Sequence, residues 1–237
     1  GLINVGAANG IGGTVLFDPE NIILNNTAVP IPGFGQPNGT PDVAFADNSG
    51  VDMEVNVGQV QGFSELFLQA NNNITVASPL GMTSFDGNIR FDAGNDIYVN
   101  AAMSAGLLAG NITLNANNNI NVNAALTSGF LGKAILTANA DNLNGGDINI
   151  GANITGYAGV VLKAANITQT AGDIITAGNL MVGRAGDVSI TATGDVNLGN
   201  ANINAYGTTS VGDGTEGGKV TIQANSFAMT GDINTYG

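Results

Sequence analysis

Residues 110–124 read GNITLNANNNINVNA and carry the pattern that determines the fold. Ile112 and Leu114 alternate with polar residues, and the alternation resumes at Ile120 and Val122 after a run of Asn. Strict alternation of apolar and polar residues indicates a strand with one buried and one exposed face. Asn favours tight turns, because it tolerates left-handed backbone angles and hydrogen-bonds its own backbone. The stretch therefore predicts a strand, a tight corner and a second strand.

The same phrase recurs along the chain. An Ala closes the first strand of each unit, and successive copies of this Ala are 22 to 32 residues apart. The marker residues are Ala70, Ala93, Ala116, Ala138, Ala164, Ala192 and Ala224. A nearly constant step that lengthens by loop insertion is typical of a solenoid whose coils stack on one another. Each step has room for two or three short strands, which predicts a parallel β-helix.

A leucine-rich-repeat horseshoe has a similar period and is the main alternative architecture. That fold requires an L-x-x-L-x-L scaffold, whereas this chain has Ile and Val at period two and no sustained helical spacing. The 36 Gly, together with about one Asn in every seven residues, are sufficient for frequent corners. We therefore predict an all-β parallel β-helix. At about 23 residues per coil, the 237 residues give about ten coils and a rod of about 50 Å.

We expect residues 1–237 to form one continuous β-helix that is an internal segment of a longer chain. Residues 28–50 interrupt the strand pattern. The prolines of this segment are Pro30, Pro32, Pro37 and Pro41. Because proline cannot donate to a β-ladder, we predict a Pro/Gly-rich loop that protrudes from the coil. Such loops often carry binding sites, although an insertion without a binding role is the simpler interpretation.

The charge balance argues against nucleic acid as a partner. Eighteen acidic and five basic residues give a net charge of −13, which repels a phosphate backbone. The basic residues are scattered singly through the sequence, at Arg90, Lys133, Lys163, Arg184 and Lys219. The absence of Cys excludes disulfides and thiolate metal sites, and suits a chain that crosses membranes unfolded. The sequence also lacks an apolar run long enough for membrane insertion.

Three stretches resemble a known family of exported adhesins. Residues 12–24 read GGTVLFDPENIIL, residues 43–57 read VAFADNSGVDMEVNV and residues 67–76 read FLQANNNITV. With LFDPENI as the most specific phrase, they are similar to filamentous-haemagglutinin-like passengers of two-partner secretion systems with cyanobacterial-type repeats. The resemblance covers most of the chain, and its GDI-x-I-x-A units are common to β-helical passengers.

The resemblance implies a right-handed β-helix that is exported through an outer-membrane β-barrel transporter. It also implies a secreted protein, displayed on or shed from the surface of a Gram-negative bacterium. The family's N-terminal secretion domain carries Asn-Pro-Asn phrases, and the nearest match in this chain is QPNG at residues 36–39, inside the predicted loop. This difference agrees with an internal segment of a longer chain.

Catalysis would have to use carboxylates, because the chain has no His for a triad, a general base or a metal site. β-Helices can be polysaccharide lyases or hydrolases that use acidic pairs. The candidate residues are Asp86, Asp92 and Asp96, with Arg90 beside them in the sequence. We interpret Arg90 and Asp92 as a solvated ion pair on one strand. The sequence therefore predicts no catalytic, cofactor-binding or metal-ligating residues and no enzymatic activity.

Signals for calcium and for glycosylation are weak. The Gly-Gly-x-Gly-x-Asp nonapeptide is absent and residues 213–216 are shorter than an EF-hand loop. We therefore expect no cofactor, with adventitious Ca²⁺ on the acidic surface as the alternative. Asn-x-Thr triplets match glycosylation acceptors, and we interpret them as coincidences of the repeat. They begin at Asn73, Asn111, Asn153 and Asn166.

The Asn-rich corners predict a structural ladder. The triplets at 71–73 and 117–119 occupy equivalent corners, with Gly94, Asn95 and Asp96 in the unit between them. Stacked Asn side chains can hydrogen-bond along a solenoid axis, as they do in cross-β stacks. We expect these side chains to stabilise the stack and not to bind a ligand.

These observations favour a non-catalytic extracellular structural or adhesive protein that mediates cell-surface adhesion or aggregation. Expected partners are glycans or proteins on host or neighbouring cells, the β-barrel transporter during export, and further copies of the chain. The first alternative is a self-assembling surface-layer or extracellular filament subunit, which would bury residues 28–50 between copies. The second alternative is a β-helical polysaccharide lyase or hydrolase.

Overall fold

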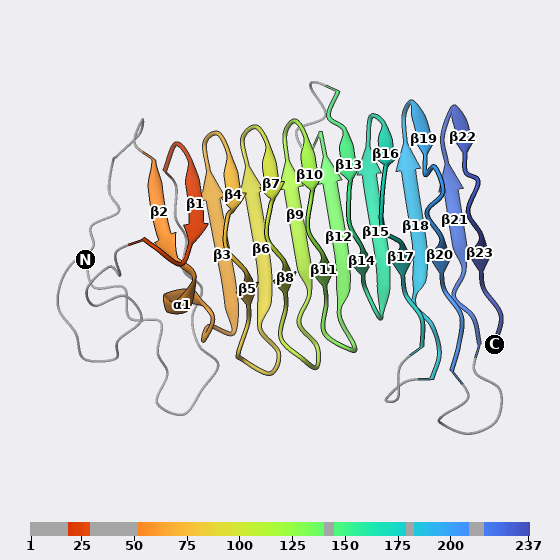
Figure 1. Ribbon diagram of the computed structural model, residues 1–237, viewed down its shortest axis with the longest axis horizontal. Helices are drawn as coiled ribbons and strands as arrows, with labels where there is room; N and C mark the ends of the chain where they lie inside the picture. The colour runs from red at the N-terminus through yellow and green to blue at the C-terminus, as the bar shows by residue number, and fades with distance from the viewer. Residues whose placement is uncertain (1–18, 29–51, 140–144, 179–182, 209–215) are drawn as a thin grey trace.

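The computed structural model shows an all-β parallel solenoid in which each coil of chain stacks on the previous one (Figure 1). The structure describes residues 19–28, 52–139, 145–178, 183–208 and 216–237. From β3 onward, each coil contributes one strand in turn to three parallel sheets, which we name sheets A, B and C. The fold class predicted from the period-two alternation is therefore confirmed.

Sheets A and C have seven strands each, and sheet B has nine. Sheet A contains β3 (Glu65–Ala70), β6 (Asn88–Ala93), β9 (Ile112–Ala116), β12 (Lys133–Ala138), β15 (Gly159–Ala164), β18 (Asp187–Ala192) and β21 (Val220–Gln223). Sheet B contains β1 (Ile22–Asn25), β2 (Met53–Asn56), β4 (Ile74–Val76), β7 (Ile97–Val99), β10 (Ile120–Val122), β13 (Ile148–Ile150), β16 (Ile167–Gln169), β19 (Asp195–Asn197) and β22 (Ser226–Ala228). Sheet C contains β5 (Leu80–Gly81), β8 (Met103–Ser104), β11 (Leu126–Thr127), β14 (Ile154–Thr155), β17 (Ile174–Ile175), β20 (Ile203–Asn204) and β23 (Ile233–Asn234).

A single turn of helix, α1 (Val57–Val60), connects β2 to β3. The Asn56 side chain caps it by accepting the Gly58 N–H at 3.0 Å, and both Val57 and Val60 are buried. Within the described ranges, no helix has the length and hydropathy needed to span a membrane.

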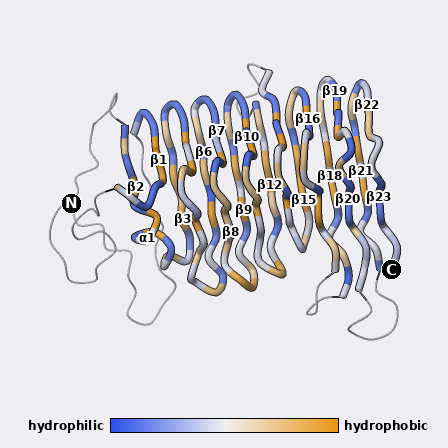
Figure 2. The backbone as a smooth tube through the Cα atoms, in the orientation of Figure 1, coloured by the Kyte–Doolittle hydropathy of each residue, from blue (hydrophilic) through white to orange (hydrophobic). Residues whose placement is uncertain are grey.

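The core consists of parallel columns of apolar side chains. Equivalent residues of neighbouring coils pair directly, so an inward position holds a similar residue in every coil. One column of sheet A contains Leu68, Phe91, Leu114, Leu136, Leu162 and Ile190, all fully buried. Burying a side chain of this size contributes about 1.5 to 3 kcal/mol. Hydrophilic residues gather instead at the corners between sheets A and B, along the upper edge in Figure 2.

The recurring Ala lies where it was predicted, but the number of coils is smaller than predicted. Ala70, Ala93 and Ala116 pair in register, and each closes a buried face of sheet A. From β3 to β23 the chain passes through seven stacked coils, fewer than the ten expected. The estimate assumed about 23 residues throughout, whereas the step lengthens to 32 residues near the end, and residues 1–18 and 29–51 lie outside the described ranges.

Sheet B departs from sequential winding at its N-terminal end. Strand β1 pairs with β2 on one side and with β4 on the other, so β2 lies outside β1 although it follows β1 in the sequence. The segment that joins them contains the predicted loop at 28–50. Apart from Ala28, that loop lies outside the described residues.

The last coil is more exposed than the coils before it. Phe227 and Ile233 are 47% and 44% exposed, whereas their partners in the preceding coil, Val196 and Ile203, are buried. The difference arises because the coil from β21 to β23 contacts described residues on one side only.

Several glycines at the corners between sheets C and A have no room for a side chain. A Cβ on Gly132 would lie 2.0 Å from the Gly110 carbonyl oxygen of the neighbouring coil, so Gly132→Ala must push two coils apart. We expect this change to lower the free energy of unfolding by about 3 kcal/mol, measured by chemical denaturation. Gly151→Ala is the matched control, because its Cβ would meet the Val122 oxygen at an ordinary 3.5 Å. Equal losses for the two variants would contradict the close packing of this corner.

Candidate functional site

A ladder of polar side chains runs along the corner between sheets A and B, the A–B corner. The residue at the start of each sheet B strand, except β2, belongs to it: six members directly precede their strand, and the last two are the first residues of β19 and β22. Each member bonds to its equivalent in the next coil. The members are Asn21, Asn73, Asp96, Asn119, Asp147, Asn166, Asp195 and Ser226. In the first six steps an Oδ1 atom accepts the backbone N–H of the next member at 2.9 to 3.0 Å. The last step is a 2.8 Å bond from Ser226 Oγ to Asp195 Oδ1.

The structure confirms the predicted ladder and adds the atoms that form it. Asn73 and Asn119 are members, and Asp96 links them from the coil between. Side-chain amides reinforce three of the steps. Asn95 Nδ2 donates to Asn73 Oδ1 at 3.0 Å, Asn118 Nδ2 donates to Asp96 Oδ1 at 2.9 Å, and Asn166 Nδ2 donates to Asp147 Oδ1 at 2.9 Å. The main donors, however, are backbone N–H groups of corner residues, which do not pair within a sheet. A buried backbone N–H needs a hydrogen-bond partner.

A second ladder, at the corner between sheets B and C, was not predicted. Its members Asn153, Asp173, Asn202 and Asp232 are joined by Oδ1-to-N–H bonds of 2.8 to 3.0 Å. The signal was present in the sequence, because each of these residues directly precedes the Ile that begins a sheet C strand.

Hydrogen bonds between coils, of the same kind as in the ladders, also explain the Asn-x-Thr triplets. Asn73, Asn111, Asn153 and Asn166 each accept a backbone N–H from the next coil. The residue after each Asn is a buried Ile that begins a strand, and the following Thr lies on the opposite face of that strand. The triplets are therefore a structural phrase of the repeat and not coincidences.

The three candidate carboxylates lie in different parts of the coil. Asp86 is exposed at the corner before β6, Asp92 lies on the outer face near the end of β6, and Asp96 is a buried member of the A–B ladder. Asp86 lies in a turn two residues before β6 begins and Asp92 is the fifth residue of that strand, so most of the length of β6, about 13 Å, lies between them. Across the described parts of the chain, no group of three or more acidic side chains is close enough to hold a metal ion.

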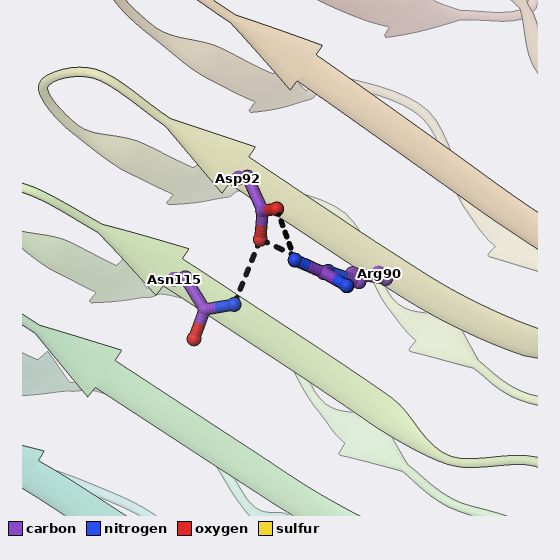
Figure 3. Close-up of polar contacts among 3 residues, drawn as sticks. All are labelled: Arg90, Asp92 and Asn115. Carbon is purple, nitrogen blue, oxygen red and sulfur yellow. Dashed lines mark hydrogen bonds and ion pairs between the residues drawn. The ribbon is translucent and has the colours of Figure 1, made fainter. Parts of the chain in front are cut away.

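Arg90 and Asp92 form the ion pair expected from their alternate positions on one strand (Figure 3). Arg90 donates to Asp92 through Nη2 at 2.6 Å and through Nε at 3.3 Å, and Asn115 Nδ2 donates to Asp92 from the next coil at 2.7 Å. The Arg90 guanidinium also lies 4.6 Å from the centre of the Phe67 ring. The hydrogen bond to Asp92 holds the pKa of Arg90 above its ordinary value. The arrangement satisfies both charges locally.

All the basic residues of the chain lie on one side of the solenoid. Arg90, Lys133 and Lys163 belong to sheet A strands, and Arg184 and Lys219 lie just before β18 and β21 at the corner between sheets C and A, the C–A corner. All five are exposed. The charged residues of the A–B and B–C ladders are, by contrast, all acidic: Asp96, Asp147, Asp173, Asp195 and Asp232. The basic residues are scattered in the sequence, but the coil register gathers them on the surface.

A groove of about 270 Å³ opens at the C–A corner beside these cations. Its lining combines the rings of Phe130 and Tyr157, which meet edge to face with centroids 5.3 Å apart, with the side chains of Arg184 and Asp187. Leu131, also in the lining, is 46% exposed. The groove, which we name the corner groove, therefore offers apolar surface, one cation and one carboxylate.

Comparisons with protein-family models, with curated proteins and with solved structures found no match to this chain. The functional argument therefore depends on the geometry of the solenoid, its ladders and the corner groove.

Asn119 allows a direct test of the A–B ladder. Asn119→Ala leaves the Asp147 N–H without its acceptor, and we expect a loss of about 1 to 2 kcal/mol in the free energy of unfolding. Replacing Asn118 and Asn119 together should lower the melting temperature further, because Asp96 then also loses the Asn118 amide. Asn117→Ala is the matched control in the same triplet, where the hydrogen bond comes from the backbone N–H. If the double substitution leaves the melting temperature unchanged, the ladder does not contribute to the stability of the fold.

Tyr98 provides a pH-dependent test of the same corner. Its hydroxyl donates to Asp96 Oδ2 at 2.8 Å, and this bond, with some burial, raises the pKa of Tyr98 above its ordinary value of about 10. The stabilisation is therefore complete below pH 10 and is lost as the pH rises through the folded-state pKa. We expect ultraviolet titration to show one tyrosine ionising above the ordinary range, with Tyr98→Phe removing that step and Asp96→Asn lowering it. A titration unchanged by Asp96→Asn would contradict this assignment.

Proposed function

We propose that the chain is a non-catalytic, extracellular structural and adhesive rod of the filamentous-haemagglutinin-like kind, carried on the surface of a Gram-negative cell. The observation that carries the proposal is the unbroken stacking of coils. All three sheets pair continuously from β3 to β23, and the A–B ladder runs without interruption from Asn21 to Ser226.

Continuous stacking supports a mechanical role because it distributes the same interactions along the whole rod. Each coil pairs with its neighbours through three strands, and each neighbour adds ladder bonds at the corners. Seven coils at about 4.8 Å per step give about 30 Å of rigid rod within the described part of the chain. Such a rod holds its outer faces at a fixed distance from the cell, where many weak contacts combine through their effective concentration.

The positions of the acidic residues support the non-catalytic part of the proposal. Asp92 is engaged by Arg90 and Asn115, Asp96 is engaged by two ladder donors, and Asp86 lies at the far end of β6. A lyase or hydrolase would require two of these groups to converge on one sugar ring. Partners of the rod are then glycans or proteins on neighbouring cells, and the β-barrel transporter during export.

Adhesion can be measured as the capture of cells by beads that carry the chain. Beads coated with the purified chain should collect cells of the source bacterium or of its neighbours, whereas beads coated with a heat-unfolded sample should not. Electron tomography of source cells, labelled with an antibody against the chain, should show label on isolated stalks or at cell contacts. Label on a regular lattice or along repeating fibres would overturn the adhesive role in favour of a self-assembling layer or filament.

A further inference from the structure

We propose that the corner groove binds a carboxylated sugar residue, as found in uronate-containing polysaccharides. This assignment rests on the proposed adhesive function, for which it names the class of glycan. Three features of the groove support it: its size, the pairing of aromatic and charged groups in its lining, and the position of the basic residues around it.

The size of the groove favours a single ring. Its volume of about 270 Å³ is close to the lower limit of about 300 Å³ for small-molecule sites. A helix of a protein partner, about 10 Å across, would not enter such a space. The groove is also preformed, because the backbone is tightly packed beneath it: a Cβ on Gly186 would lie 2.4 Å from the Ala158 carbonyl carbon.

The lining suits the two sides of a pyranose. Phe130 and Tyr157 present apolar ring surface on which the C–H face of a sugar can pack. Asp187 can accept sugar hydroxyls, and its Oδ1 atom is held in place by the Lys219 backbone N–H at 2.9 Å. Arg184 supplies the planar fork of donors that recognises a carboxylate.

The Arg184 guanidinium is accessible to such a ligand. Its side chain is 59% exposed, and its closest approach to Glu216 is 3.8 Å, with Glu216 itself 78% exposed. An exposed pair at this distance contributes little, so a ligand carboxylate can replace Glu216 at small cost. Arg90 differs, because its bonds to Asp92 as short as 2.6 Å occupy the guanidinium.

The neighbouring cations extend the attraction beyond the groove. Lys133, Gly159 and Asp187 are aligned across three coils, and the place of a Gly159 Cβ lies 3.8 Å from Lys133 Cε. The lysine side chain therefore lies against the backbone of the next coil at Gly159. Lys219 follows in the next coil, so Lys133 and Lys219 lie on the same side of the solenoid as Arg184, outside the lining of the groove, although the chain carries a net charge of −13. An anionic polymer is therefore attracted at this face, while the acidic ladders repel it elsewhere.

The surface leading to the groove fits a polymer as well as a single sugar. The C–A corners of the two preceding coils expose Phe85 and Leu107, each 59% exposed. The backbone holds these corners in line, since Leu108 N–H donates to the Phe85 oxygen at 2.9 Å and Phe130 N–H donates to the Leu107 oxygen at 3.0 Å. Sugar residues next to the bound ring can pack along this apolar edge.

The experiment measures binding of the purified chain to immobilised polygalacturonate, with free galacturonate as competitor. Dextran serves as a neutral polymer and single-stranded DNA as a polyanion without carboxylated sugars. Arg184→Gln and Tyr157→Ala should each weaken binding about tenfold or more, whereas Tyr157→Phe should bind like the unaltered chain. Arg90→Gln is the matched control with the same loss of charge on the same side of the solenoid, and should change binding less than twofold. Competition by free galacturonate would place recognition at the level of one sugar, and its failure would show that only the polymer is recognised.

Melting curves of each variant separate loss of folding from loss of binding. The proposal is overturned if the unaltered chain does not bind, if Arg90→Gln weakens binding as much as Arg184→Gln, or if DNA binds as well as polygalacturonate. Self-association that Arg184→Gln abolishes would assign this face to a second copy of the chain instead. If coated beads still collect cells while polygalacturonate is not bound, this inference fails and the proposed adhesive function stands.

Discussion

The fold depends on satisfying backbone N–H groups where the chain leaves one sheet and enters the next. Within the sheets, and at corner positions such as Asn117, backbone carbonyls of the neighbouring coil accept these groups, but the N–H at the entry to a sheet B strand has no such partner. Asn and Asp provide it, because a side-chain oxygen one residue before a strand accepts the N–H of its equivalent in the next coil, as Asn73 does for Asp96. Since the acceptor directly precedes the first buried Ile, this bond also fixes the register. A slip by one residue would turn every buried side chain of the strand outward.

Register, once fixed at the corners, determines the rest of the core. Leu114 stacks between Phe91 and Leu136, and Ile120 stacks between Ile97 and Ile148, so each coil buries its apolar face only against its neighbours. Such stability is cooperative along the axis and close to a sum over adjacent coils. Glycines at the C–A corner also allow neighbouring coils to stack closely. At Gly132, the backbones of two coils approach so closely that any side chain would separate them.

The local features of the fold could be predicted from the sequence, and the features that depend on register between distant residues could not. Alternation at 110–124 and the recurring Ala predicted the strands and the stacking, and the Asn triplets predicted the A–B ladder. The place of β2 outside β1 was missed, because it depends on Leu24 pairing with Val76 across the intervening segment. The corner groove was missed for a related reason. Its residues come from three coils separated by corners of variable length, so Tyr157 and Arg184 meet only after the register is known.

The lengths of the strands explain why three of the five basic residues are found on sheet A. Inward positions and ladder positions are committed to packing and to backbone hydrogen bonds, which leaves only the outward positions of a strand for charged side chains. Most sheet A strands have six residues and therefore three outward side chains, whereas sheet C strands have two residues and present one. Sheet A is thus the only broad flat face among the described residues on which charge can be arranged in two dimensions. Side chains along this face can therefore vary without disturbing the ladders that hold the coils together.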